Sequence, residues 1–246
     1  MSETPLYMIR TELDQRALFE LGRARRLPVR DVDTGYLVHC ALRELFGEAG
    51  PQPFATRQRD RFIEVLGYSE QTPEQFLAHA RSFAEPLSWA VLRDRQLLGK
   101  VMPAAFSPGT TLGFEVRSCP VVRKSNAGPK HRKGAEVDAF LAHCWSVPQG
   151  ELVDREAVYR SWLADQFRTG NAARLVSMRQ VSFTRRRLAR STHGVGSGFH
   201  LAERPDALLC GTLEVTDSAN FQALLRRGVG RHRAFGFGML LLRPPR

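Results

Sequence analysis

The chain has few cysteines, few lysines and no long apolar run. Its four cysteines are scattered over 246 residues, and no two of them form a CxxC pair. A disulfide framework, a zinc knuckle and any other metal or cofactor site are therefore not expected. No apolar stretch approaches the roughly 18 residues of a membrane span, and the opening MSETPLYMIRTELD has no signal-peptide core. We therefore expect a cytoplasmic protein without a membrane partner.

Positive charge is abundant and unevenly placed. The chain has 36 basic and 25 acidic residues, a net charge of +11, and only four of the basic residues are Lys, which leaves 32 Arg. Arg grips phosphate with a planar fork of donors, although a GC-rich genome gives the same bias. Residues 172–246 contain 13 Arg and four acidic residues, a balance of +9, whereas residues 1–50 contain seven Arg and eight acidic residues. This distribution predicts a polyanion bound by the C-terminal half.

The order of predicted elements indicates the fold class. Apolar residues make up 43% of the chain, which is enough for a packed core. Hydrophobic periodicity gives strand, helix, strand, strand, helix, and then a similar series. This order predicts an α+β fold of two ferredoxin-like βαββαβ halves, similar to RNA-recognition domains, with a C-terminal glycine-rich loop. The halves are expected at residues 1–110 and 111–246, from element order alone, because no internal repeat is visible.

Two further segments have local patterns that fit more than one structure. Residues 87–106, LSWAVLRDRQLLGKVMPAAF, have the pattern of a hairpin or two strands. The arginine cluster TRRRLAR at 184–190 follows a strand. If the cluster is helical, Arg186 and Arg190 share a face with Arg187 beside them, and they form a phosphate-gripping ridge. A solvated charged loop is the alternative.

The clearest predicted helix spans residues 31–50. Apolar residues recur at 37, 38, 41, 42, 45 and 46, and Gly47 ends the helix. Three polar residues can cap its start, namely Asp31, Asp33 and Thr34. Tyr36, His39 and Arg43 are spaced by three and four residues, so they share a face beside the apolar stripe. An imidazole titrates near neutrality and can take or give a proton, although a buried helix histidine shows the same pattern.

Glycines recur near the C-terminus in GVGRHRAFGFGMLLL. The segment contains Gly228, Gly230, Gly236 and Gly238 around Arg231, His232 and Arg233. Glycines let the backbone approach a phosphate and turn its N–H groups toward it. The Lys-Ser/Thr pair and the preceding strand of a P-loop are missing, so this is not a nucleotide-binding fingerprint. A structural turn between a helix and a strand fits the pattern equally well.

Four stretches, in order, resemble the CRISPR repeat-RNA endonucleases. The C-terminal segment matches G-[IV]-G-x-x-x-[AS]-x-G-x-G-[LM]-L, which ends the CasE branch of type I-E systems. PLYMIRTELD is similar to the family's first strand, GYLVHCALRELF to its Tyr-x-x-His helix, and FEVRSCPVVRK to its F-x-[LV]-R-x-x-P strand. GNAAR at 170–174 also matches a family turn. The resemblance therefore touches both halves of the chain.

This resemblance implies a metal-independent endoribonuclease that cuts CRISPR repeat RNA beside a stem-loop. In the family a 2′-hydroxyl attacks in line, leaving a cyclic phosphate and a 5′-hydroxyl, and the enzyme keeps the hairpin in an effector complex with other subunits. Such a reaction needs a base, an acid and cations around the phosphorane. The resemblance implies that His39 is catalytic and that Tyr36 orients it or bonds the phosphate. A packing role for Tyr36 stays open.

Two features depart from the CasE pattern. The segment GRARRLPVRDVDTG before the helix is longer and richer in Arg, and TRRRLARSTHGVGSG holds a denser cluster. Both resemble the related nucleases of type IV systems, in which arginine takes over part of the catalytic work. Arg23, Arg26 or Arg30 are therefore candidates beside His39.

RNA contacts are expected from the basic segments. An A-form major groove is too narrow for most base readout, so recognition should use phosphates. Beside the glycine-rich loop, the expected RNA-binding residues are Arg30, Arg117, Arg123, Lys124, Arg185, Arg186, Arg187 and Arg190. Two other functions remain open: a non-catalytic subunit of the same fold that only holds the hairpin, and an unrelated basic RNA-binding protein.

Overall fold

The computed structural model describes residues 4–29, 33–191 and 199–245, and these form two antiparallel four-stranded sheets. The N-terminal half contains β1 (Tyr7–Asp14), α1 (Gln15–Ala24), α2 (Gly35–Phe46), η1 (Gly47–Ala49), β2 (Phe54–Gln58), β3 (Phe62–Ser69), α3 (Pro73–Phe83), α4 (Pro86–Trp89) and β4 (Leu92–Val101). Its sheet has the order β2-β3-β1-β4. This is the order of a ferredoxin-like βαββαβ unit.

The C-terminal half repeats this topology with insertions. It contains β5 (Thr111–Ser118), β6 (Val121–Arg123), β7 (Glu136–Asp138), α5 (Ala139–Cys144), α6 (Arg155–Arg168), β8 (Ala173–Ser191), β9 (Phe199–Val215), α7 (Ser218–Arg227), η2 (Arg233–Phe235) and β10 (Leu241–Arg243). The sheet order is β10-β5-β9-β8, and β6 and β7 form a separate ribbon. The predicted tandem ferredoxin-like fold is confirmed. The domain boundary after residue 110 falls between β4 and β5, and division into two domains stays a prediction.

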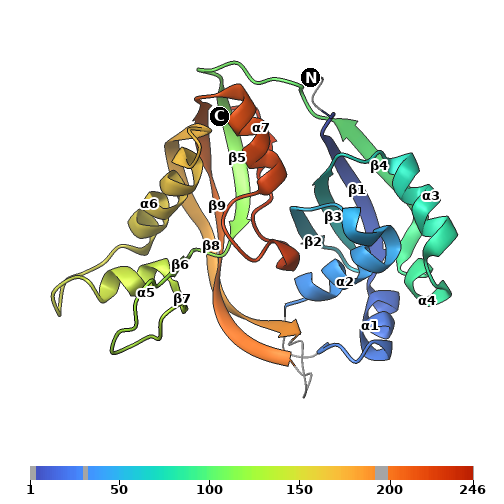
Figure 1. Cartoon of the computed structure of the whole chain (residues 1–246), viewed down its shortest axis with the longest axis horizontal. Coiled ribbons are helices and arrows are strands. Elements are labelled where there is room, and N and C mark those ends of the chain that lie inside the picture. The colour runs from blue at the N-terminus through green and yellow to red at the C-terminus, as the bar shows by residue number, and fades with distance from the viewer. Residues whose placement is uncertain (1–3, 30–32, 192–198, 246) are drawn as a thin grey trace.

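Figure 1 shows the sheets beside each other, with α6 on one outer flank and α3 on the other. The long β8–β9 hairpin leaves its own sheet and runs below the molecule toward the N-terminal half. Among the contacts between the halves, η2 and β8 contact α2, and α7 contacts β3. No helix of the described ranges is long and apolar enough to cross a membrane.

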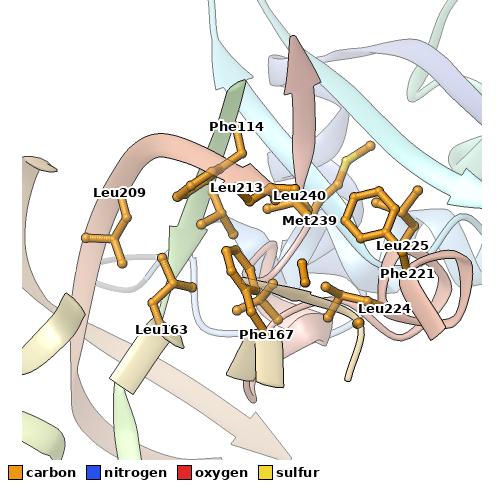
Figure 2. Close-up of a cluster of buried hydrophobic side chains, with 14 of the residues drawn as sticks. Phe114, Leu163, Phe167, Leu209, Leu213, Phe221, Leu224, Leu225, Met239 and Leu240 are labelled. Carbon is orange, nitrogen blue, oxygen red and sulfur yellow. The ribbon is translucent and has the colours of Figure 1, made fainter. Parts of the chain in front are cut away.

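Each half has its own apolar core. In the C-terminal half, helices α6 and α7 cover one sheet face, and Phe114 of β5 meets Phe167 of α6 edge to face at 5.4 Å (Figure 2). Burying each such ring contributes about 1.5–3 kcal/mol. Tyr68 of β3 joins the two halves, because it packs in this core and its hydroxyl donates to the Leu240 carbonyl at 2.8 Å.

The prediction of a hairpin or two strands at residues 87–106 is wrong. Pro86 begins the short helix α4, because its fixed φ suits a first helical position. One strand follows, β4, which pairs with β1. Asp94 and Arg95 both have φ of +51°, and the register shifts opposite them between Thr11 and Leu13. These turn-like residues therefore make a bulge within one strand.

The arginine cluster is extended and is neither a helical ridge nor a loop. β8 is 19 residues long and pairs with β9 from Ala173 to Ser191. Because side chains alternate along a strand, Arg186 faces the side opposite to Arg185 and Arg187. The sequence patterns did not assign the short strand β2 to a segment, because FATRQ is short and polar toward its end.

Candidate active site and nucleic-acid interface

Helix α2 brings the predicted catalytic side chains to the junction of the halves. Its apolar stripe, including Leu37, Val38 and Ala41, is buried in the N-terminal core, and this leaves Tyr36 and His39 partly exposed on another face. Among the expected caps, Asp33 accepts the Gly35 N–H at 2.9 Å. Thr34 occupies the N-cap position but makes no side-chain cap bond, and Asp31 lies outside the described residues. As predicted, Gly47 ends the helix.

Tyr36 and His39 are neighbours in an aromatic group. Their ring centroids are 6.2 Å apart, and the Tyr36 ring stacks on Phe235 of η2 at 5.4 Å. Phe199 of β9 approaches Tyr36 edge-on at 6.5 Å. Tyr36 thus packs between α2 and the C-terminal half while one side of it remains near His39.

Burial lowers the pKa of His39, and the positive charge of Arg43 lowers it further. The imidazole is therefore neutral at neutral pH and can accept a proton. Burial raises the pKa of the adjacent Cys40 to about 11, so its thiol stays protonated and is a poor nucleophile. Of the two side chains, His39 is the group suited to proton transfer.

The candidate arginines near α1 differ in their surroundings. Arg23 lies near the end of α1 and Arg26 just beyond it, and both are exposed without an ion pair to any residue that the structure describes. Arg25 between them bonds Glu44 of α2 at 2.9 Å and Glu85 at 2.6 Å. Arg25 thus joins α1 to α2 and leaves its two neighbours open to an anion. Arg30 lies outside the described residues.

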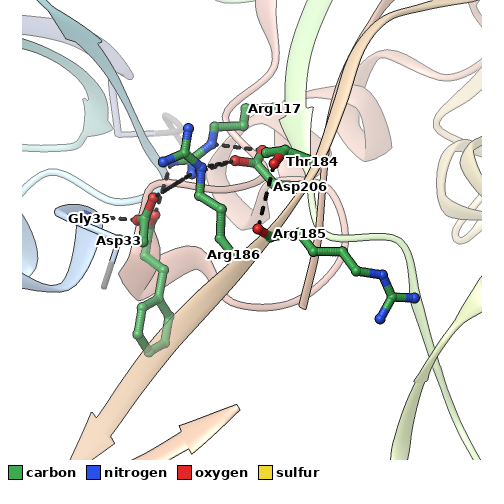
Figure 3. A network of polar contacts seen from close by, with 8 residues as sticks. Asp33, Gly35, Arg117, Thr184, Arg185, Arg186 and Asp206 are labelled. Atoms are coloured by element: carbon green, nitrogen blue, oxygen red, sulfur yellow. Dashed lines mark hydrogen bonds and ion pairs between the residues drawn. The ribbon is translucent and has the colours of Figure 1, made fainter. Parts of the chain in front are cut away.

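Arg117 is the centre of a network of four charged side chains (Figure 3). Its Nε and Nη2 donate to the two oxygens of Asp206 at 3.0 and 2.8 Å, and Nη2 also donates to Asp33 Oδ2 at 2.7 Å. Arg186 donates from Nε to Asp206 Oδ2 at 2.7 Å. The Asp33 and Asp206 side chains are only 4% and 8% exposed. Arg117 was expected to contact RNA, but its guanidinium faces these two carboxylates inside the protein.

The other arginines of the cluster point elsewhere. Arg185 points away from the Arg117 network (Figure 3) and lies 3.5 Å from Asp138 and 3.9 Å from Glu203. Arg187 is exposed and has no ion pair within the described ranges. The backbone of Arg190 continues β8, and its side chain lies outside the description. Of the three whose side chains are described, Arg187 is the residue most open to a ligand.

The glycine-rich loop is not an exposed phosphate cradle. Gly228, Gly236 and Gly238 are buried, and their N–H groups donate to the carbonyls of Leu224, Arg233 and Arg117. A Cβ at Gly238 would lie 2.4 Å from the Val229 carbonyl oxygen, so close packing requires glycine there. Gly230 packs against Trp162 at a positive φ. The alternative of a structural turn is therefore the better description of these glycines.

A basic cavity lies beside this loop. It has a volume of about 390 Å³ and is lined by residues that include Arg123, Arg132, Lys133, Arg204, Arg231 and His232. One carboxylate, Glu136 of β7, lies among them, 2.8 Å from His232 and 2.5 Å from Arg231. The hydrogen bond to His232, together with the charges of His232 and Arg231, lowers the pKa of Glu136 to about 2. The cavity walls are cationic, whereas Arg233 lies outside them and contacts the Arg227 carbonyl. Lys124 follows β6 on the same ribbon.

Sequence reasoning missed the acidic partners in this region. Asp33 was considered only as a cap, and neither Asp206 nor Glu136 was singled out. Alternation along β9 places Asp206 on the same face as Arg204, but nothing local indicates that it meets Arg117. No group of three or more His, Cys, Asp or Glu side chains suited to a metal occurs in the described part of the chain.

Comparisons with known proteins agree with this geometry. The fold matches that of the CRISPR endoribonuclease Cse3 bound to a 19-nucleotide RNA, with TM-score 0.64, 21% identity, and coverage of 98% of this chain and 100% of that one. It also matches Thermus thermophilus Cse3 bound to an RNA representing a pre-cleavage complex, with TM-score 0.63, 19% identity and coverage of 98% and 100%.

A chain of a CRISPR RNA-guided surveillance complex matches with TM-score 0.56, 12% identity and coverage of 95% and 98%. No curated protein sequence matches significantly. The family model described as CRISPR associated protein matches residues 6–244. The predicted resemblance is therefore confirmed, and the chain belongs to the CRISPR-associated protein family.

Proposed function

We propose that the protein is an endoribonuclease that cleaves CRISPR repeat RNA beside its stem-loop. The observation that carries this proposal is the position of His39, a neutral imidazole next to Tyr36 at the junction of the halves. The fold that it shares with RNA-bound Cse3 supports the same assignment.

In the proposed reaction, His39 and Tyr36 act from α2, and Arg23 and Arg26 act from the end of α1. His39 takes the proton of the 2′-hydroxyl, whose oxygen bonds to the adjacent phosphorus while the bond to the 5′-oxygen breaks. The products are a 2′,3′-cyclic phosphate and a 5′-hydroxyl. The leaving 5′-oxygen takes a proton from a general acid on the side of the phosphorus opposite the attacking 2′-oxygen. Arg23 and Arg26 stabilise the negative charge of the phosphorane, and Tyr36 hydrogen-bonds a phosphate oxygen. The substrate supplies its own nucleophile, so the reaction needs no metal.

The RNA stem is held by phosphate contacts from the C-terminal half. Arg123 and Lys124 of the β6–β7 ribbon, Arg231 beside the cavity and Arg187 of β8 face solvent or the cavity and carry this role. Contacts of this kind position a duplex without reading its bases. After cleavage the protein keeps the hairpin as a subunit of a CRISPR effector complex.

The test is cleavage of repeat RNA in EDTA by the purified protein. We expect full activity, no cleavage when the nucleotide before the cut is 2′-deoxy, and a loss of about 100-fold or more in His39→Ala at unchanged affinity. Arg174→Ala, which removes an exposed pair with Glu214 far along β8, is the matched control. Complete metal dependence would contradict the mechanism.

Two other outcomes would identify different functions. Tight binding without cleavage by the wild type would identify a non-catalytic hairpin-binding subunit. Normal cutting by His39→Ala, with inactive Arg23→Ala or Arg26→Ala, would identify an arginine-centred site.

A further inference from the structure

The first turn of α2 is attached to the C-terminal half by three kinds of contact. The Asp33 N–H donates to the Arg187 carbonyl of β8 at 3.0 Å. Gly35 lies so close to η2 that a Cβ would be 2.1 Å from the Phe235 carbonyl oxygen. The Tyr36 ring stacks on Phe235, as described above. All three contacts lie within four residues of one helix end, one turn before His39.

Arg117 supplies the ionic part of this attachment from β5, an inner strand of the C-terminal sheet. Its guanidinium joins Asp33, just before α2, to Asp206 of β9, and its centre lies 4.3 Å from the Phe237 ring centroid. Its backbone carbonyl accepts the Gly238 N–H at 2.8 Å. One residue of β5 therefore contacts the segment just before α2, β9 and the glycine-rich loop at the same time.

We propose that Arg117 is a positioning residue that, through Asp33, sets where α2 places Tyr36 and His39 relative to RNA held by the C-terminal half. This inference rests on the proposed function. Two buried carboxylates engage the Nε and Nη2 groups of Arg117, so the inference assigns Arg117 to positioning rather than to RNA contact.

The geometry of the network suits such a role. A guanidinium bound to both oxygens of one carboxylate is fixed in direction as well as distance, which a single ion pair does not achieve. The carboxylates are buried, so salt screens the network far less than surface charges. In-line attack tolerates little displacement, because a shift of about 1 Å at the reacting groups costs on the order of 100-fold in rate.

The decisive variant is Asp33→Asn. The amide oxygen can still accept the Gly35 N–H, while the amide nitrogen replaces the oxygen that accepts from Arg117. We expect the single-turnover rate at saturating protein to fall about 10- to 100-fold, with affinity for a 2′-deoxy repeat RNA within about threefold of wild type. Arg117→Lys should show the same split, because an ammonium cannot bond both carboxylates with Arg geometry.

The matched control is Arg155→Met. Arg155 is also partly buried, lies 3.3 Å from Asp138, and packs on Phe140 and Phe183, but it joins α6 to β7 rather than α2 to β9. The single-turnover cleavage rate of the Arg155→Met variant at saturating protein should stay at the wild-type value even if the melting temperature of the variant falls. Circular dichroism and thermal unfolding establish that each variant is folded.

Amide hydrogen exchange of the RNA-free protein gives a second measurement that does not depend on cleavage. We expect faster exchange at residues 38–40 in Asp33→Asn and Arg117→Lys, and no change there in Arg155→Met. A folded Asp33→Asn protein with wild-type rate and exchange overturns the inference. Loss of affinity with an unchanged saturated rate also overturns it, since Arg117 then acts in binding. Failure of the wild type to cleave any repeat RNA instead rejects the proposed nuclease function.

Discussion

At the residue scale, two causes hold the pKa of His39 below its ordinary value. Burial in the junction is the larger cause of its lowered pKa, and the charge of Arg43, one turn further along α2, is the second. Both disfavour the imidazolium form. In the proposed reaction, a histidine held neutral in this way can accept the 2′-proton, and the protonated thiol of Cys40 does not compete with it.

Replacing Arg43 by Gln removes one of these causes and should raise the pKa of His39. Arg43 also contacts Glu48, whose charge is then left unpaired and favours the imidazolium further. In the proposed reaction the neutral form is the base, so the acidic limb of the rate profile should move to higher pH. The variant should then lose activity at a pH where the wild type is still active. Single-turnover rates against pH, with an NMR titration of His39, measure this. A shift of the alkaline limb instead would identify His39 as the acid.

At the scale of elements, the β8–β9 hairpin divides its arginines between structure and ligand binding. Alternation turns Arg186 toward Asp206, whereas Arg187 lies on the other face and is exposed. Arg185 lies near Asp138. A cluster that is uniform in sequence is therefore divided by the two-residue period of the strand.

Arg187→Ala should weaken repeat-RNA binding about fivefold to tenfold, roughly 1–1.4 kcal/mol, without changing the rate at saturating protein. The physical reason is that a phosphate contact on the stem acts equally on ground and transition states. Titration by gel shift and single-turnover cleavage measure the two quantities. The combined replacement of Arg185, Arg186, Arg187 and Arg190 by Ala should cost more affinity, and Arg174→Ala on the same strand should cost none. Normal binding with failed cleavage in the combined variant would place the cluster in the active site.

On the scale of the whole molecule, the charge of +11 should dominate the proposed association with RNA. Most of it lies in the half that carries the basic cavity, the β6–β7 ribbon and the β8–β9 hairpin. Two acidic residues of that half, Asp206 and Glu136, form ion pairs within the protein with more than one basic side chain each. The surface offered to a polyanion is therefore concentrated on one part of the molecule.

Binding should weaken steeply as salt rises. Each neutralised phosphate releases counterions, so the logarithm of the association constant should fall against the logarithm of salt by about 0.7–0.9 per contact. Fluorescence anisotropy of a 2′-deoxy repeat RNA over a salt series measures the slope. The combined variant that replaces Arg185, Arg186, Arg187 and Arg190 by Ala should reduce this slope. Thermal unfolding over the same series controls for stability. A nearly flat dependence would mean that the C-terminal charge lies away from the RNA.

Local patterns along the sequence determined the element types that depend on a few neighbouring residues. The helix carrying Tyr36 and His39 and its end at Gly47 follow from periodicity and capping. The order of these elements was enough to predict two ferredoxin-like halves. The motif resemblance added the family and the candidate histidine.

The tertiary structure alone decided what meets across the chain. Arg117 lies 84 residues from Asp33 and 89 from Asp206, and no local pattern indicates that these three side chains meet. Pairing with β9 likewise made the arginine cluster a strand, and packing against Arg117 and Val229 buried the glycines expected at phosphate. Charge type and periodicity are local properties of a sequence. Whether a given arginine faces a carboxylate or a ligand depends on which distant strand lies beside it, and only the folded chain settles that.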